Sequence, residues 1–100
     1  MNKYTFFEDP GHGWLAVSLH ELSELGLVNK ISGYSYVSRD RQTVYLEEDC
    51  DESRFLAAKL GPYDKETRNW NEWRDQNVDT VYHEDNRIRG LPAYRLMAPA

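Results

Sequence analysis

The sequence contains one cysteine, Cys50, and no long hydrophobic run. A lone cysteine excludes an internal disulfide and a zinc site built from several cysteines. No uninterrupted apolar run is longer than four residues, as in Trp14–Val17, whereas a membrane-spanning helix needs about 20. The N-terminus also lacks the apolar region of a signal peptide. We therefore expect a cytoplasmic protein that is stabilised by the packing of its core.

Positive charge is also scarce. The 100 residues include 12 Lys and Arg against 17 Asp and Glu, for a formal net charge of −5. This balance gives no general basic surface for DNA or RNA and disfavours anionic membranes, but it suits a basic protein partner. The length fits one domain over residues 1–100. We expect a protein partner and no direct contact with nucleic acid or membrane.

Short segments of alternating or apolar residues predict strands separated by turns. The predicted strands cover Lys3–Phe7, Trp14–Val17, Tyr34–Val37, Thr43–Leu46 and Val78–His83. The third and fourth of these form a hairpin, whose second strand points Val44 and Leu46 to one face. A turn cluster at 84–86 follows the last strand, and the tail around Arg87–Tyr94 can add an edge strand.

Helix signals occur between these strands. The predicted helices cover Leu19–Leu25, the segment from Asp49 to Gly61, and Tyr63–Asn77. Ser18 caps the first helix, Gly26 ends it, and Asp49 caps the second. Strands and helices do not alternate regularly. The sequence therefore predicts an α+β domain with a small, mostly antiparallel sheet of about four or five strands, packed with two or three short helices.

Five carboxylates occur within the six residues Glu47–Glu52. Three interpretations are open: a solvated helix N-terminus, where the helix dipole favours carboxylates, a divalent-metal site, and an acidic docking patch. The spacing lacks the calcium-loop pattern with its central glycine. Cys50 lies within this run, where negative neighbours disfavour its thiolate. We interpret it as a small buried side chain at the strand-to-helix corner and not as a nucleophile.

The three histidines, His12, His20 and His83, show no pair at zinc-ligand spacing. His12 lies between two glycines in a loop, so it is the histidine expected to touch a ligand, although a tight turn also explains this pattern. No serine lies in a GxSxG motif. We predict no catalytic residue, no metal ligand and no cofactor. The alternative is a small metal-dependent or hydrolytic enzyme that uses His12, His83 and the carboxylates.

Aromatic residues make up 13% of the chain, and Tyr and Trp often anchor protein interfaces. Trp70 and Trp73 lie in a polar segment, where they either face a partner or pack on the sheet. Arg87, Arg89 and Arg95 form a small basic stretch that can contact phosphates or pair with the acidic run. We predict that a partner binds the acidic run and the two tryptophans, namely Glu47, Glu48, Asp49, Asp51, Glu52, Trp70 and Trp73.

Several motifs together resemble a family of small proteins of bacteriophages, prophages and plasmids. The motifs are His12–Leu15 (HGWL), Lys30–Ser32 (KIS), Tyr34–Tyr36 (YSY), Tyr45–Asp51 (YLEEDCD) and Arg87–Arg89 (RIR). The resemblance covers most of the chain except about residues 60–77, and it brings no catalytic or binding residue with it. It implies a mobile-element origin and a location in the cytoplasm of a bacterial host.

Small acidic proteins of mobile elements include inhibitors of host defence, among them anti-CRISPR proteins. By that context we expect an inhibitor that is not an enzyme and that acts by contact with a host protein or nucleoprotein complex. A self-associating phage accessory protein is a further alternative.

Overall fold

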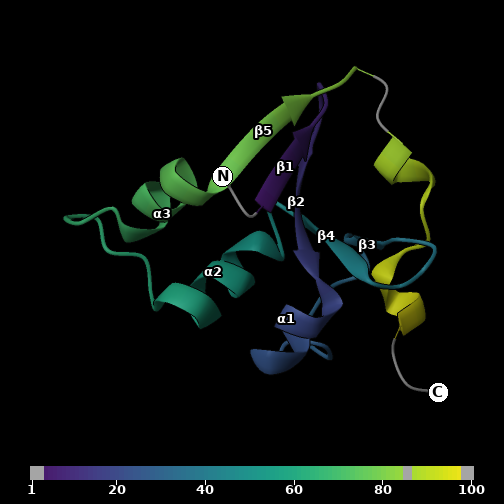
Figure 1. Cartoon of the computed structure of the whole chain (residues 1–100), viewed down its shortest axis with the longest axis horizontal. Helices are drawn as coiled ribbons and strands as arrows, with labels where there is room; N and C mark the ends of the chain where they lie inside the picture. The colour runs from purple at the N-terminus through teal and green to yellow at the C-terminus, as the bar shows by residue number, and fades with distance from the viewer. Residues whose placement is uncertain (1–3, 85–86, 98–100) are drawn as a thin grey trace.

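The computed structural model describes residues 4–84 and 87–97, which form one sheet with helices packed on it (Figure 1). The strands are β1 (Tyr4–Glu8), β2 (Gly13–Ser18), β3 (Tyr36–Val37), β4 (Thr43–Glu47) and β5 (Val78–Tyr82). The helices are α1 (Leu19–Glu24), α2 (Glu52–Leu60) and α3 (Asn69–Asn77), followed by the 3-10 helices η1 (Arg87–Gly90) and η2 (Tyr94–Met97). The strand order is β3-β4-β2-β1-β5, antiparallel except for the parallel pair of β1 and β5. The predicted α+β fold with a mostly antiparallel sheet is confirmed.

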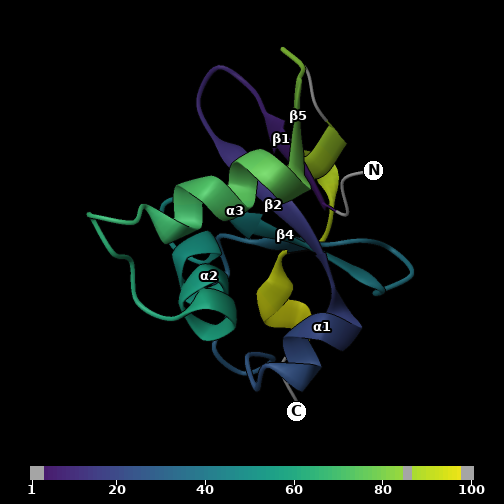
Figure 2. The same ribbon diagram turned by 60° about the vertical axis from the view of Figure 1, so that its left-hand side comes forward.

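The two faces of the sheet carry different side chains, because successive residues of a strand point to opposite sides. Leu15 of β2 pairs with Phe6 of β1 and Leu46 of β4, and all three are buried in one core cluster. Trp14 precedes Leu15 in β2 and pairs with Glu47 of β4. Its side chain therefore lies on the opposite face of the sheet. α2 and α3 lie on the core side of the sheet, whereas η1 lies on the Trp14 side (Figure 1, Figure 2).

The predicted hairpin is confirmed as β3 and β4. Its register places Tyr36 opposite Tyr45 and Val37 opposite Val44. Val44 and Leu46 are both fully buried, as the alternation predicts. The first strand of the hairpin is shorter than predicted, since it starts at Tyr36.

Helix α1 begins where the sequence predicts and ends within one residue of the predicted position. The Ser18 Oγ accepts a hydrogen bond of 3.1 Å from the backbone N–H of Glu21. Gly26 has φ of 72°, a left-handed conformation that glycine adopts without strain. The backbone N–H of Leu27 then donates to the carbonyl of Leu22 at 2.9 Å, which completes a Schellman-type helix end.

The start of α2 differs from the prediction. Asp49 does not cap this helix, so that prediction is wrong. The helix begins at Glu52, and Asp51 occupies the cap position without a side-chain cap hydrogen bond. The carboxylate of Asp51 is instead hydrogen-bonded to the loop before β3. Tertiary contacts therefore replace local capping at this helix end.

Helix α3 is shorter than the predicted helix. Arg68, just before its first residue, has φ of 53° in the left-handed region, which interrupts a helix. A separate turn precedes it, in which Asp64 Oδ1 accepts hydrogen bonds from the backbone N–H groups of Glu66 and Thr67. The second half of the predicted helix is helical, whereas its first half forms a turn.

The tail contributes less sheet than predicted. Residues 87–97 form two 3-10 helices, and the segment between them makes an isolated bridge from Ala93 to Tyr36 in place of a strand. The predicted strand start at Lys3 and the turn residues Asp85 and Asn86 lie outside the described residues. Across residues 4–84 and 87–97, no helix is long and apolar enough to cross a membrane.

Candidate functional site

The acidic run 47–52 is divided among three surroundings and does not form one patch. Glu47 ends β4 on the Trp14 face, while Glu48, the next residue, lies beside side chains of α2 and α3. Asp51 is buried, and Glu52 begins α2. Because successive side chains alternate at the end of β4, the carboxylates of Glu47 and Glu48 lie on opposite sides of the sheet.

Asp51 is an interior residue with 0% exposure. Its carboxylate accepts hydrogen bonds from the backbone N–H of Ser32 at 3.0 Å and from the hydroxyls of Ser32 and Ser35 at 2.6 and 2.5 Å. The Ser35 hydroxyl also accepts a hydrogen bond from the backbone N–H of Glu47. Asp51 therefore joins the loop before β3 to the start of α2, and we remove it from the predicted partner contacts.

A groove of about 340 Å³ lies on the helix side, where α2 meets the start of α3. Figure 2 shows these two helices next to each other. We call the groove the helix-side groove. Its lining residues are Glu48, Glu52, Ser53, Leu56, Tyr63, Trp70, Asn71 and Arg74. Three of the residues predicted to bind a partner, Glu48, Glu52 and Trp70, therefore meet in one place.

Glu52 is an incompletely paired buried acid in the wall of this groove. Only 4% of the residue is exposed. Its Oε1 accepts a hydrogen bond of 3.4 Å from Arg74 Nη1, while its Oε2 is buried with no hydrogen-bond partner among the described residues. Burial raises the pKa of Glu52 to about 7; Arg74 opposes this shift, and the negative charges of Glu48 and Glu47 add to it. When Glu52 is ionised, its Oε2 accepts no hydrogen bond from the described residues, and a ligand could supply the missing donor.

An aromatic pair forms the opposite part of the groove. The rings of Tyr63 and Trp70 meet edge to face, with 5.4 Å between their centroids. The Trp70 Nε1–H donates to the carbonyl of Gly61 at 2.9 Å, and the Tyr63 hydroxyl donates to Asn71 Oδ1 at 2.8 Å. Tyr63 is 44% exposed. The pair is thus held in place and still offers apolar surface to solvent.

Trp73 does not line this groove. Its ring contacts those of Tyr4 and Phe55 at centroid distances of 5.0 and 6.2 Å, at the edge of the core. It packs on the sheet, which was one of the two interpretations of the tryptophans. We therefore remove Trp73 from the partner contacts as well.

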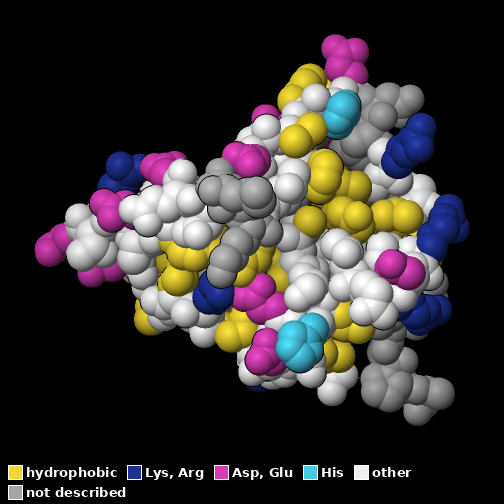
Figure 3. Space-filling model, viewed as in Figure 1, with side chains coloured by type: hydrophobic (Ala, Val, Ile, Leu, Met, Phe, Trp, Pro, Cys, Tyr) yellow, Lys and Arg dark blue, Asp and Glu magenta, His cyan; other side chains and the backbone are white. Residues whose placement is uncertain are grey.

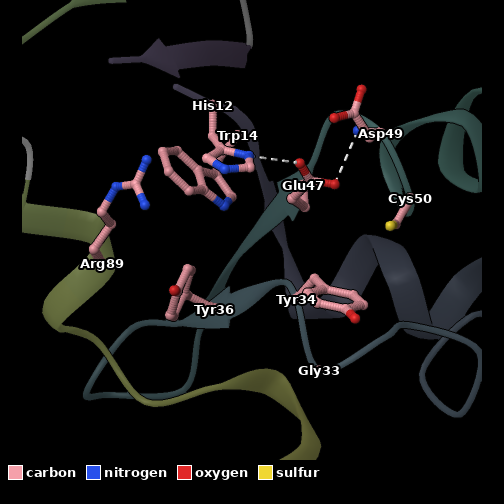
Figure 4. Close-up of a pocket in the computed structure, with 9 residues that line it drawn as sticks. All are labelled: His12, Trp14, Gly33, Tyr34, Tyr36, Glu47, Asp49, Cys50 and Arg89. Carbon is pink, nitrogen blue, oxygen red and sulfur yellow. Dashed lines mark hydrogen bonds and ion pairs between the residues drawn. The ribbon is translucent and has the colours of Figure 1, made fainter. Parts of the chain in front are cut away.

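A second cavity, of about 310 Å³, lies on the other face of the sheet near the end of β4 (Figure 4). We call it the sheet-side cavity. The Nδ1 of His12 lies 3.3 Å from Glu47 Oε1, and the backbone N–H of Asp49 donates to Glu47 Oε2 at 2.9 Å. Trp14 and Tyr36 line the cavity with their rings 6.0 Å apart. The other two predicted partner contacts, Glu47 and Asp49, thus lie here and not at the groove.

Cys50 lines the sheet-side cavity but is half-buried, whereas the sequence predicted a buried side chain. Burial raises the pKa of its thiol, and a hydrogen bond to Glu47 and the nearby negative charges raise it further. A thiol in these surroundings is a poor nucleophile.

Arg89 lines the sheet-side cavity, whereas His20 and His83 lie apart from both cavities. Arg89 pairs with Asp9, at 2.8 Å between Nε and Oδ2, and not with the acidic run. This ion pair lowers the pKa of the Asp9 carboxyl well below its usual range. His20 lies 3.3 Å from Glu24 on the exposed side of α1, and His83 is exposed just after β5.

Trp14, Tyr63 and Arg74 are among the lining residues that were not predicted from the sequence. Trp14 was assigned to a strand, but its face was not. Tyr63 follows Gly61–Pro62 directly, and an aromatic residue after a helix stop is a weak signal of a packed corner. No local pattern indicates that Arg74 faces Glu52, because the two residues lie on different helices.

A comparison of the chain with protein-family models, with curated proteins and with solved structures finds no match to any of them.

Proposed function

We propose that this protein is a non-enzymatic binding protein that holds a basic, partly apolar segment of a protein partner in the helix-side groove. The observation that carries the proposal is Glu52 Oε2, a buried acceptor in the groove wall with no partner among residues 4–84 and 87–97. A buried acceptor without a donor costs free energy. A guanidinium or ammonium group of a partner supplies the missing donor.

The charges around the groove favour a cation. Glu48 and Glu52 carry two negative charges when both are ionised, and Arg74 carries one positive charge. Burial and the negative charges of Asp49 and Glu47 raise the pKa of Glu48. A cation placed beside these carboxylates favours their ionised form. An incoming Arg or Lys side chain therefore neutralises an excess of negative charge that the fold leaves in place.

The apolar part of the groove completes this recognition surface. Tyr63 and Trp70 present ring faces and edges next to Leu56. Guanidinium groups stack on aromatic rings, and aliphatic side chains are buried against them. Hydrophobic side chains also reach the surface beside the projecting segment between α2 and α3, which carries charges of both signs (Figure 3). A segment with Arg or Lys next to an apolar residue fits this combination.

The resemblance to proteins of mobile elements indicates that the proposed partner belongs to a bacterial host. Such a partner is a host protein or nucleoprotein complex that presents a basic surface, as proteins that handle nucleic acids do. Inhibition of that partner, in the manner of anti-CRISPR proteins, is the form of activity that we propose. The charge and the aromatic surface of the groove do not depend on which host protein it is.

A selection from a random peptide library tests the proposal. We expect enriched peptides to share an Arg or Lys next to an apolar residue. Binding of a synthetic copy, measured by fluorescence anisotropy, should weaken at least about tenfold in Glu52→Gln and in Tyr63→Ser, which corresponds to about 1.4 kcal/mol.

Matched controls for these variants lie elsewhere on the surface. Glu24→Gln removes an exposed carboxylate of α1, and Tyr82→Ser removes an exposed aromatic side chain of β5. Both should bind the peptide as the wild type does. Enriched peptides without a basic residue, or equal affinity in the groove variants and the controls, would contradict the proposal.

A further inference from the structure

We propose that His12, Glu47 and Asp49 form a binding site for a divalent first-row transition-metal ion, with Zn²⁺ as the best match. The site lies in the sheet-side cavity and is separate from the helix-side groove (Figure 4). The three side chains come from the β1–β2 loop, from the end of β4 and from the turn that follows it.

The spacing of the three side chains suits one ion. One ligand atom from each residue lies within 4.8 Å of the other two. The His12 Nδ1 and Glu47 Oε1 are 3.3 Å apart, and two ligands of a tetrahedral zinc ion with bonds of about 2.0–2.1 Å are about 3.4 Å apart. Asp49 is exposed, and one of its carboxylate oxygens lies within 4.8 Å of both other ligand atoms.

The protein holds two of the three ligands in position. Glu47 is 5% exposed, and its Oε2 accepts a hydrogen bond from the backbone N–H of Asp49, which leaves Oε1 toward His12. The loop that carries His12 is fixed by Asp9, whose Oδ1 accepts the backbone N–H of His12 at 2.9 Å. Asp9 is itself paired with Arg89. Such outer contacts orient metal ligands in many proteins.

A second, independent observation in the same cavity points to a ligand. Trp14 is 2% exposed, and its Nε1–H has no acceptor within the part of the chain that the structure describes. In Figure 4 this nitrogen lies on the side of the indole ring that faces the space among the labelled side chains. A buried donor of this kind is normally satisfied. An oxygen ligand such as a water molecule on the metal would satisfy it.

The donor set favours a transition metal over Mg²⁺ or Ca²⁺. Imidazole nitrogen suits Zn²⁺, Cu²⁺, Fe²⁺ and Ni²⁺, whereas Mg²⁺ and Ca²⁺ prefer oxygen ligands throughout. One nitrogen and two carboxylates also leave a fourth position for water, as in three-ligand zinc sites. From the sequence we predicted no metal ligand and kept His12, His83 and the carboxylates only as the alternative of a metal-dependent enzyme. His12 is far along the chain from the acidic run, so ligand spacing could not show that it meets Glu47 and Asp49.

Isothermal titration calorimetry of the untagged full chain with ZnCl₂, and then with CaCl₂, tests this proposal. We expect one Zn²⁺ per chain with Kd of about 10 µM or tighter, and no saturable binding of Ca²⁺. The variants His12→Gln and Asp49→Asn should each weaken Zn²⁺ binding at least about tenfold. Both residues are exposed, so the variants should fold, and circular dichroism checks that they do.

Two matched variants serve as controls. His20→Gln removes an exposed histidine of α1, and Glu66→Gln removes an exposed carboxylate between α2 and α3. Both should bind Zn²⁺ within about twofold of the wild type, well below the tenfold loss expected at a ligand position. Absence of saturable Zn²⁺ binding to the wild type would overturn the proposal, as would equal binding by His12→Gln and His20→Gln. Neither result bears on peptide binding in the helix-side groove.

Discussion

The pH dependence of stability should reveal Glu52 as a buried acid with a raised pKa. In the unfolded chain Glu52 is an ordinary glutamate with a pKa of 4.5, whereas burial in the groove wall raises the pKa in the fold to about 7. Between these values the folded state holds a proton that the unfolded state has lost. Stability should therefore fall as pH rises from about 5 to about 7 and should level off above this range.

The magnitude follows from the pKa difference. One pKa unit corresponds to about 1.4 kcal/mol, so a change from 4.5 to about 7 corresponds to about 3 kcal/mol at most. The charged groups that face Glu52 are Arg74 of α3 and Glu47 and Glu48 at the end of β4. The partial ion pair with Arg74 already limits the shift, since it favours the ionised form.

Urea unfolding of the wild type and of Glu52→Gln at several pH values measures this effect. Glutamine has nearly the same shape and does not titrate. The difference in unfolding free energy between the two proteins should therefore change by about 2–3 kcal/mol between about pH 5 and about pH 8, in favour of the variant at the higher pH. Glu66→Gln, at an exposed position between α2 and α3, should keep a constant difference from the wild type. A constant difference for Glu52→Gln as well would refute the reasoning.

Four further variants test how the fold supports the two cavities. Asp51→Asn should destabilise the protein by about 2–4 kcal/mol in urea unfolding. The asparagine amide replaces one acceptor oxygen with an N–H group, which would face the donors of Ser32 and Ser35 that now bond the buried carboxylate. Gly13→Ala should destabilise it by about 1–3 kcal/mol, because a Cβ there would lie 2.2 Å from a ring atom of the core aromatic residue Phe6. Gly90→Ala should be nearly neutral in the same assay, because a Cβ there meets no atom within 4 Å. Arg89→Gln should lower the urea concentration at the midpoint of unfolding, because it removes the ion pair to Asp9.

Each of these expectations can fail in a recognisable way. An Asp51→Asn variant as stable as the wild type would mean that the serine hydrogen bonds do not hold the start of α2. Equal stabilities of Gly13→Ala and Gly90→Ala would contradict the close approach of β2 to the core ring. If Arg89→Gln unfolds at the same urea concentration as the wild type, the loop of His12 does not depend on this ion pair.

Most local features of the fold could be predicted, because their signals lie within a few residues. The Ser18 cap, the Gly26 helix end and the hairpin that contains Val44 and Leu46 each depend on residue types at short spacing. The parallel pairing of β1 with β5 could not be predicted in this way. The two strands are far apart in the chain, and their alternation does not specify a partner.

The candidate site was predicted in part. The acidic run and Trp70 were correctly placed near a strand end and a helix, but the division of the run was not foreseen. The predicted hairpin strand ended at Leu46, so nothing assigned a face to Glu47 or Glu48. Glu47 lies on the Trp14 face because it pairs with Trp14 in the neighbouring strand. This pairing is a tertiary contact and cannot be read from the spacing of the carboxylates.

The most direct test of the proposed function is a nuclear magnetic resonance titration of the ¹⁵N-labelled chain with a short peptide that contains an Arg next to a Leu. We expect shifts confined to the residues of the helix-side groove, including the side-chain N–H of Trp70, and we expect Glu52→Gln to remove most of them. Shifts centred on the sheet-side cavity or along β5, or no shifts at peptide concentrations of about 1 mM, would contradict the proposed function.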